Sequence, residues 1–245
     1  MCGALFFAKI LQVNVLVYGI ASLGLTVWII YTIDHLLDAR RISTQASTER
    51  HRFHQLHFKP LWRVVVLAVL VDGALTFFMR ERVLIGGIFL SGGVAVYLLI
   101  NRYLKMLKEV LISVLYTCGI LMPSIMVTDF SVGEIPWWLV VQFVLTALLN
   151  LLVFSWFDYE NDLRDNTISF VTAVGKRFTG FCMATLFLLI SMMFLYAPTL
   201  ETFLIFCIGI GNLLLLCRQQ YFGENERFRS VGDALFMLPI LYYLL

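Results

Sequence analysis

Charged residues are scarce in this chain. Asp, Glu, Lys and Arg together make up 14% of its 245 residues, whereas about a quarter is usual for a soluble domain. Hydrophobic residues make up 60%, and the mean hydropathy is +0.88. This composition argues against an ordinary soluble domain and indicates a protein that lies largely within a lipid bilayer. The net charge of +2 is too small to indicate a nucleic-acid-binding protein.

The sequence also lacks features that would indicate other classes of protein. Its five cysteines lie in or beside apolar runs without metal-ligand spacing, and their odd number argues against a disulfide framework. No basic stretch and no small-residue cleavage site precede the first long apolar run, so we expect a retained helix there rather than a signal peptide. No internal repeat or linker is visible, which predicts a single helical domain over residues 1–245.

Long apolar runs, by contrast, are abundant. A bilayer core about 30 Å thick is crossed by roughly 20 residues of helix. Eight runs approach this length, at about 11–33, 61–79, 83–100, 109–127, 136–157, 178–197, 200–217 and 231–245. Residues 1–10 are apolar but too few to span the bilayer. We expect them to be the end of a helix that begins earlier. Asp72 lies within the second run, where we expect it to make an interior polar contact.

The basic residues gather on one side of these runs. Fifteen of the 18 Lys and Arg residues lie in or beside alternate connecting segments, whereas Lys9, Arg80 and Arg82 lie on the opposite side. By the positive-inside rule the basic side is cytoplasmic, and both termini are then outside. We therefore expect an integral multi-pass protein, in the plasma or inner membrane if the source is bacterial.

Two acidic motifs lie where a predicted span meets the basic side. Asp34 and Asp38 form the first, and Asp158 and Asp162 form the second. Aspartates four residues apart project from one face of a helix, about 6 Å from each other. Their repulsion would be offset by Mg²⁺, which commonly bridges carboxylates to substrate phosphates. Ordinary helix ends facing water are the alternative, but two such pairs on one side favour a shared site for Mg²⁺ and a diphosphate.

Basic side chains that could bind a diphosphate lie on the same side. The candidates are Arg102, Lys105, Arg164 and Lys176, although each also has the simpler role of setting the topology. Asn150 lies on the same helical face as Asp158, two turns deeper, where it could contact another helix or a substrate.

Three histidines, His51, His54 and His57, are spaced three residues apart in the segment 43–58. No cysteine or second cluster completes a zinc site with them. We therefore expect this segment to face solvent or lipid headgroups.

Together these motifs resemble the UbiA superfamily of intramembrane prenyltransferases. Phe157–Arg177, FDYENDLRDNTISFVTAVGKR, is similar to the second Asp-rich motif of that family, and Asp34 and Asp38 fall on its first. The segment 102–123, RYLKMLKEVLISVLYTCGILMP, resembles the entry to the family's middle helix, with Lys105 at a basic position.

The resemblance implies a UbiA-like helical bundle and a prenyl transfer. Mg²⁺ bound by Asp34, Asp38, Asp158 and Asp162 would hold a prenyl diphosphate, and the prenyl group would pass to a lipophilic, commonly aromatic acceptor. Lys105 and Arg164 would assist departure of the diphosphate.

The chain departs from the family pattern at several positions. Ile30 and Ile168 stand where Asn and a second Lys are expected, and Asn166 replaces a glycine. The family has nine transmembrane helices and a cytoplasmic N-terminus, and loss of one leading helix accounts for the eight runs and outside terminus predicted here. These departures leave open a non-catalytic UbiA-like protein that binds lipid or a partner.

A transporter that uses the carboxylates as a cation or proton site is a third interpretation. Transporters typically place such groups near the midplane and often contain two related halves. The acidic motifs here lie at the ends of the runs, and no halves repeat.

Overall fold

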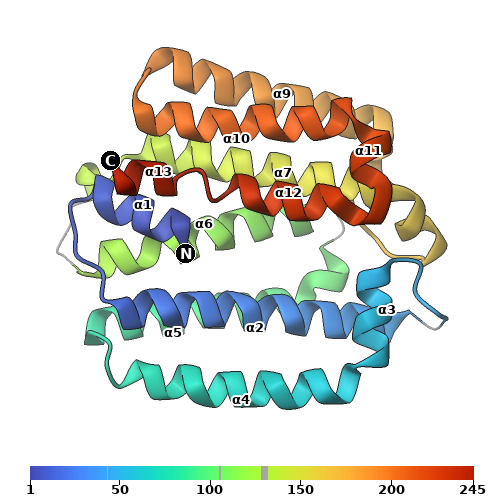
Figure 1. The fold of residues 1–245 in the computed structure, drawn as a ribbon, viewed down its shortest axis with the longest axis horizontal. Helices are drawn as coiled ribbons and strands as arrows, with labels where there is room; N and C mark the ends of the chain where they lie inside the picture. Colours follow the sequence, from blue (N-terminus) through green and yellow to red (C-terminus); the bar gives the residue numbers. More distant parts are fainter. Residues whose placement is uncertain (43, 105, 128–131) are drawn as a thin grey trace.

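The chain folds as a bundle of helices (Figure 1). The computed structural model describes residues 1–42, 44–104, 106–127 and 132–245, and these contain no strand. The helices in chain order are α1 (Cys2–Ile10), α2 (Val17–Arg41), α3 (Glu49–Leu56), α4 (Phe58–Thr76), α5 (Glu81–Ile100), η1 (Asn101–Tyr103), α6 (Leu107–Val127), η2 (Val132–Glu134), α7 (Trp137–Arg164), α8 (Phe170–Val174), α9 (Lys176–Tyr196), α10 (Leu200–Cys217), α11 (Gln219–Gly223), η3 (Glu224–Glu226), α12 (Arg227–Leu235) and α13 (Ile240–Leu244).

Six of these helices are long and apolar enough to cross a membrane, namely α2, α5, α6, α7, α9 and α10. The protein thus has the architecture of a multi-pass helical membrane protein, with six supported spans where the sequence predicted eight. The run at 61–79 is helical as part of α4. Every stretch of 18 residues in α4 contains Lys59, Arg63 and Asp72, and with these three charges α4 is not among the six. The single span predicted at 231–245 is wrong, because the backbone turns between α12 and α13.

Helix α7 is the most buried of the six and forms the centre of the bundle. On one side Leu139 and Phe143 pack with α1 and α6. On the other side Leu149 and Leu152 pack with α9 and α10. Because both faces of α7 are covered, its position is fixed by packing on either side.

A buried polar side chain also holds α7 in register. The Gln142 amide Nε2 donates to the carbonyl oxygens of Ile190 in α9 and Thr202 in α10, each at 3.3 Å. Hydrogen bonds between helices stabilise membrane proteins because a backbone carbonyl has no water to bind in hydrocarbon.

Helices α2 and α4 form a pair, joined at one end by α3 (Figure 1). Ile29 of α2 packs with Val65 of α4. The Asp72 carboxylate of α4 accepts hydrogen bonds from Ser22 Oγ at 2.5 Å and Thr26 Oγ1 at 2.8 Å. The expected polar contact of Asp72 is confirmed, and it ties α4 to α2.

The two acidic motifs lie in the last turns of α2 and α7. Ser47, in the segment after α2, donates from its backbone N to both carboxylate oxygens of Asp165 at 3.0 Å, and from its hydroxyl at 2.6 Å. Asp165 immediately follows α7. This contact joins the ends of the two helices, so both motifs lie at the same end of the bundle.

Two glycines provide a test of this packing. A Cβ at Gly232 of α12 would lie 2.5 Å from a Phe154 ring carbon, whereas a Cβ at Gly73 of α4 would meet nothing within 4 Å. We expect Gly232→Ala to destabilise the protein by about 1–3 kcal/mol, because an aromatic ring must move. Gly73→Ala, the matched control, should leave stability unchanged or raise it by up to about 1 kcal/mol through helix propensity. Thermal unfolding in detergent measures both, and equal melting temperatures would contradict the close approach of α12 to α7.

Candidate functional site

A cavity of about 1150 Å³ lies between α2 and α4 on one side and α5, α6 and α7 on the other. Much of its wall is apolar, with side chains such as Leu23, Leu90, Ile112 and Leu151. All four aspartates of the two motifs, Asp34, Asp38, Asp158 and Asp162, line this one cavity. Two segments more than a hundred residues apart therefore contribute carboxylates to a common space.

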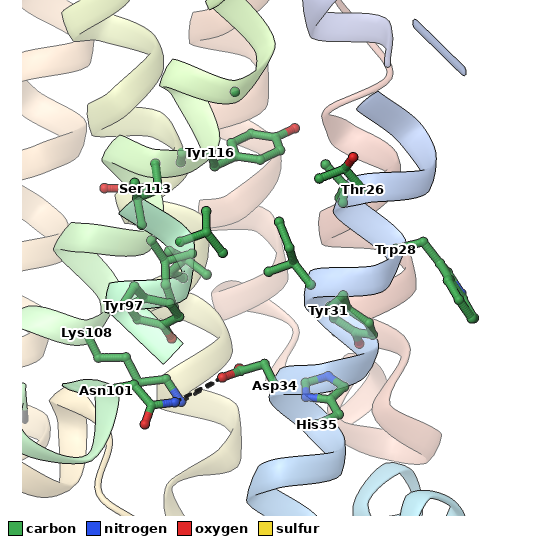
Figure 2. A pocket seen from close by; sticks show the side chains of 18 of the residues that line it. Thr26, Trp28, Tyr31, Asp34, His35, Tyr97, Asn101, Lys108, Ser113 and Tyr116 are labelled. Carbon is green, nitrogen blue, oxygen red and sulfur yellow. Dashed lines mark hydrogen bonds and ion pairs between the residues drawn. The ribbon is translucent and has the colours of Figure 1, made fainter. Parts of the chain in front are cut away.

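The first pair of aspartates is surrounded by donors. Lys108 Nζ of α6 lies 4.0 Å from Asp34 Oδ2 and 3.4 Å from Asp38 Oδ2. Arg41 Nη1 lies 3.0 Å from Asp38 Oδ1, and Asn101 Nδ2 donates to Asp34 Oδ1 at 3.1 Å. Figure 2 shows Asp34 reaching from α2 toward Asn101, with Lys108 on the same side. The two negative charges of this pair are thus balanced by two positive ones.

The second pair is neutralised less completely. Arg229 of α12 forms an ion pair with Asp158, and its guanidinium also lies 3.6 Å from Glu226. Asp162 Oδ1 accepts a hydrogen bond from the Thr167 hydroxyl at 2.9 Å. Among the described residues, Asp162 forms no ion pair. This side of the cavity consequently keeps an excess of negative charge.

The four basic residues predicted to bind a diphosphate differ in where they lie relative to the cavity. Lys105 lies outside the described residues, and Arg102 lies in η1. Arg164 is exposed and does not line the cavity. Lys176 lies 3.5 Å from Glu160 and does not line it either. The structure therefore does not bring Arg164 or Lys176 to the four aspartates.

Basic side chains that do line the cavity come from four different segments. They are Arg41, Arg50, Lys108 and Arg229. None was selected from the sequence as a site residue. The proximity of Arg41 to the first motif is visible in the sequence, but Arg229 lies 71 residues from Asp158, and no local pattern joins them.

Several buried polar atoms in the cavity wall have no protein hydrogen-bond partner. They include Asn150 Oδ1, Glu109 Oε2 and the Tyr97 hydroxyl, on residues that are 4–6% exposed. Asn150 thus lines the cavity, and its Oδ1 also lies close to Gly232 of α12. Because a buried polar atom without a partner is unfavourable, these atoms are available to a bound ligand.

The histidines of α3 do not face outward as expected. His51 and His54 are buried, and only His57 is exposed. The His35 ring centroid lies 5.9 Å from that of His51 and 5.3 Å from that of His54. Packing of α3 against the end of α2 turns these imidazoles inward, and both His35 and His51 line the cavity.

The donor set indicates which metal could bind here. Within the described part of the chain, no three His, Cys, Asp or Glu side chains are arranged to hold a metal ion. Mg²⁺ is usually held by only one or two carboxylates, together with waters and substrate phosphates. An Mg²⁺ ion at the aspartates would therefore need ligands from water or a bound molecule in addition to those of the protein.

Comparisons with protein-family models, with curated proteins and with solved structures give no match to this chain. The features that bear on its function are physical ones, namely a large cavity with an apolar body and one strongly charged end.

The buried imidazole of His51 predicts a dependence of stability on pH. Burial and the nearby Arg50 guanidinium lower the pKa of His51 from 6.5 to about 4. Between these values the unfolded chain binds a proton that the folded protein does not, so stability falls as pH falls from about 6.5 toward 4. His51→Asn should weaken this dependence, and His57→Asn, at the exposed position, should not. Melting temperatures measured from pH 7 to pH 4 test this, and equal slopes for His51→Asn and the wild type would contradict it.

Proposed function

We propose that the protein is a Mg²⁺-dependent intramembrane prenyltransferase of the UbiA type. It moves a prenyl group from a prenyl diphosphate to a lipophilic, aromatic acceptor. The observation that carries this proposal is that the aspartates of both motifs line one cavity whose remaining wall is largely apolar. A prenyl diphosphate has the same division, with a charged head and a hydrocarbon tail.

The charged end of the cavity suits a diphosphate and its counter-ion. Lys108 and Arg229 supply fixed positive charge, which stabilises the negative charge that develops on a departing diphosphate. Mg²⁺ would be held by carboxylates of this end together with diphosphate oxygens, and when bound it neutralises that same charge. Asp162, which has no ion pair among the described residues, is the most available of the four aspartates for this role.

The apolar body of the cavity suits the tail and the acceptor. Residues such as Leu90, Ile112 and Leu151 offer a wall without charge. In the proposed reaction the bond between the allylic carbon and the diphosphate oxygen breaks, and inorganic diphosphate leaves. A new bond forms from that carbon to the acceptor, which loses a proton to the released diphosphate or to water. A wall that excludes water protects an allylic cation from hydrolysis in the interval. By the distribution of Lys and Arg, the charged end faces the cytoplasm.

A non-catalytic, lipid-binding protein of the same type is the second candidate. Ile30 and Ile168, which stand where the family has polar residues, both line the cavity. The cavity wall is therefore more apolar at two positions near the charged end than the proposed reaction would predict. Binding of a prenyl lipid without turnover would favour this candidate.

Isosteric substitutions at the charged end test the catalytic proposal. We expect Asp34→Asn and Asp162→Asn each to lower turnover of a C10–C20 prenyl diphosphate at least about 100-fold. Asp162 would hold the Mg²⁺ that neutralises the departing diphosphate, and Asp34 pairs with Lys108, which supplies positive charge there. Glu160→Gln is the matched control, since Glu160 lies two residues before Asp162 on α7 but is exposed and outside the cavity.

The assay is release of inorganic diphosphate by the purified protein, with mass spectrometry of the lipids that copurify with it to identify the acceptor. Undiminished turnover in both Asp variants would rule out the proposed reaction. Absence of turnover in the wild type with every prenyl diphosphate tested, together with a copurified prenyl lipid, would support the second candidate.

A further inference from the structure

The two aspartate pairs differ in how their oxygen atoms are occupied. In the first pair three of the four carboxylate oxygens have a hydrogen-bond donor. Asn101 donates to Asp34 Oδ1, Arg41 donates to Asp38 Oδ1 and Lys108 donates to Asp38 Oδ2. The fourth oxygen, Asp34 Oδ2, lies 4.0 Å from Lys108 Nζ. A divalent cation that bridged Asp34 and Asp38 would compete with the Lys108 ammonium, which lies between their Oδ2 atoms.

The carboxylate of Glu109, the residue after Lys108, has one oxygen without a partner. Glu109, the next residue of α6, accepts a hydrogen bond at Oε1 from the backbone N of Phe170 at 2.8 Å. Its other oxygen, Oε2, is buried, has no partner, and belongs to a residue that is 6% exposed and lines the cavity. Phe170, whose backbone N donates to Glu109, directly follows Ser169, whose side chain hydrogen-bonds Asp162, so the two carboxylates lie in the same part of the cavity wall.

Glu109 and Asp162 therefore share one part of the cavity wall, and neither forms an ion pair among the described residues. Carboxylates without a paired cation are costly in a poorly solvated wall, and an unpartnered carboxylate oxygen there is unfavourable. A small cation between them would neutralise the carboxylate charge and bind the unpartnered oxygen. Carboxylate oxygens are the ligands that Mg²⁺ and Mn²⁺ prefer.

We propose that the site holds one divalent cation, between Asp162 and Glu109, and that Lys108 supplies the positive charge at Asp34 and Asp38, where a second ion would otherwise bind. The proposal rests on the proposed function, because the remaining ligands of the ion are diphosphate oxygens and water. Glu109 is thus a metal ligand, and the Lys108 ammonium takes the place of a second metal ion.

Adjacent positions on α6 explain how one helix end serves both roles. Successive residues of a helix project about 100° apart, so Lys108 can point to α2 while Glu109 points to α7 and α8. The Lys108 ammonium has three donors. One is directed at Asp38 Oδ2 at 3.4 Å, and Asp34 Oδ2 lies 4.0 Å away. In the proposed complex another donor of Lys108 would bind a diphosphate oxygen and would bring positive charge toward the ion.

Metal stoichiometry tests this arrangement without an activity assay. The purified chain, in a non-ionic detergent, is dialysed to equilibrium against Mn²⁺ and inorganic diphosphate, and the bound Mn²⁺ per chain is measured. We expect one Mn²⁺ for the wild type and none for Glu109→Gln or Asp162→Asn. Lys108→Met should bind two, because the first aspartate pair loses its cation, and Lys108→Arg should bind one.

Two controls accompany these variants. Glu160→Gln and Lys176→Met remove charges at the same end of the bundle but outside the cavity, and both should bind one Mn²⁺. Melting temperatures establish that each variant is folded before its stoichiometry is compared.

The outcomes separate the two proposals. Two Mn²⁺ in the wild type, or one that is retained in Glu109→Gln or Asp162→Asn, would overturn the assignment of the ion to Glu109 and leave the prenyltransferase proposal intact. A single Mn²⁺ in folded Lys108→Met would overturn the role of Lys108. No Mn²⁺ in the wild type would count against the proposed function itself.

Discussion

Neutralisation of carboxylates in a poorly solvated wall is the constraint on which the charged end of the cavity depends. An uncompensated charge at the edge of hydrocarbon is costly, so each acid there needs a nearby positive charge or hydrogen-bond donors. Lys108 and Arg41 meet this need for the first aspartate pair, and Arg229 meets it for Asp158. Because these cations belong to different helices, the same contacts that neutralise the acids also bring α2, α6, α7 and α12 together at one end.

The rest of the cavity follows from how the helices are held apart. Helix α7 is fixed by packing on both faces and by Gln142, whereas α2 is paired with α4 through Asp72. The two units meet at the charged end, where Ser47 contacts Asp165, and between them lies a space lined by apolar side chains. One end of this space is therefore rich in charge, whereas its body is mostly apolar and includes Asp72, whose carboxylate accepts hydrogen bonds from two hydroxyl groups of α2. The proposed substrate has the same division between a charged head and a hydrocarbon tail.

Much of the fold could be predicted from local patterns. Apolar runs near 20 residues in length identified the six helices that can cross a membrane, because hydrocarbon demands continuous apolar helix. The same rule was less reliable where the run was short or carried charge. The region 231–245 breaks into α12 and α13, and α4 keeps Asp72 because Ser22 and Thr26 of α2 accommodate it. The break before α13 falls at Pro239, which lies within the run, whereas the contacts of Asp72 depend on α2 residues that its run does not contain.

The sequence by itself determined the helical membrane class and the four aspartates, since residues four apart on one helix share a face whatever surrounds them. Only the tertiary structure decided that Lys108, Glu109 and Arg229 accompany them, and that Arg164 and Lys176 lie outside the cavity. The inward orientation of His51 was likewise set by the packing of α3. The physical reason is that ion pairs such as Lys108–Asp38 join residues 70 positions apart. Their geometry exists only after the helices have packed, and no periodicity along the chain encodes it.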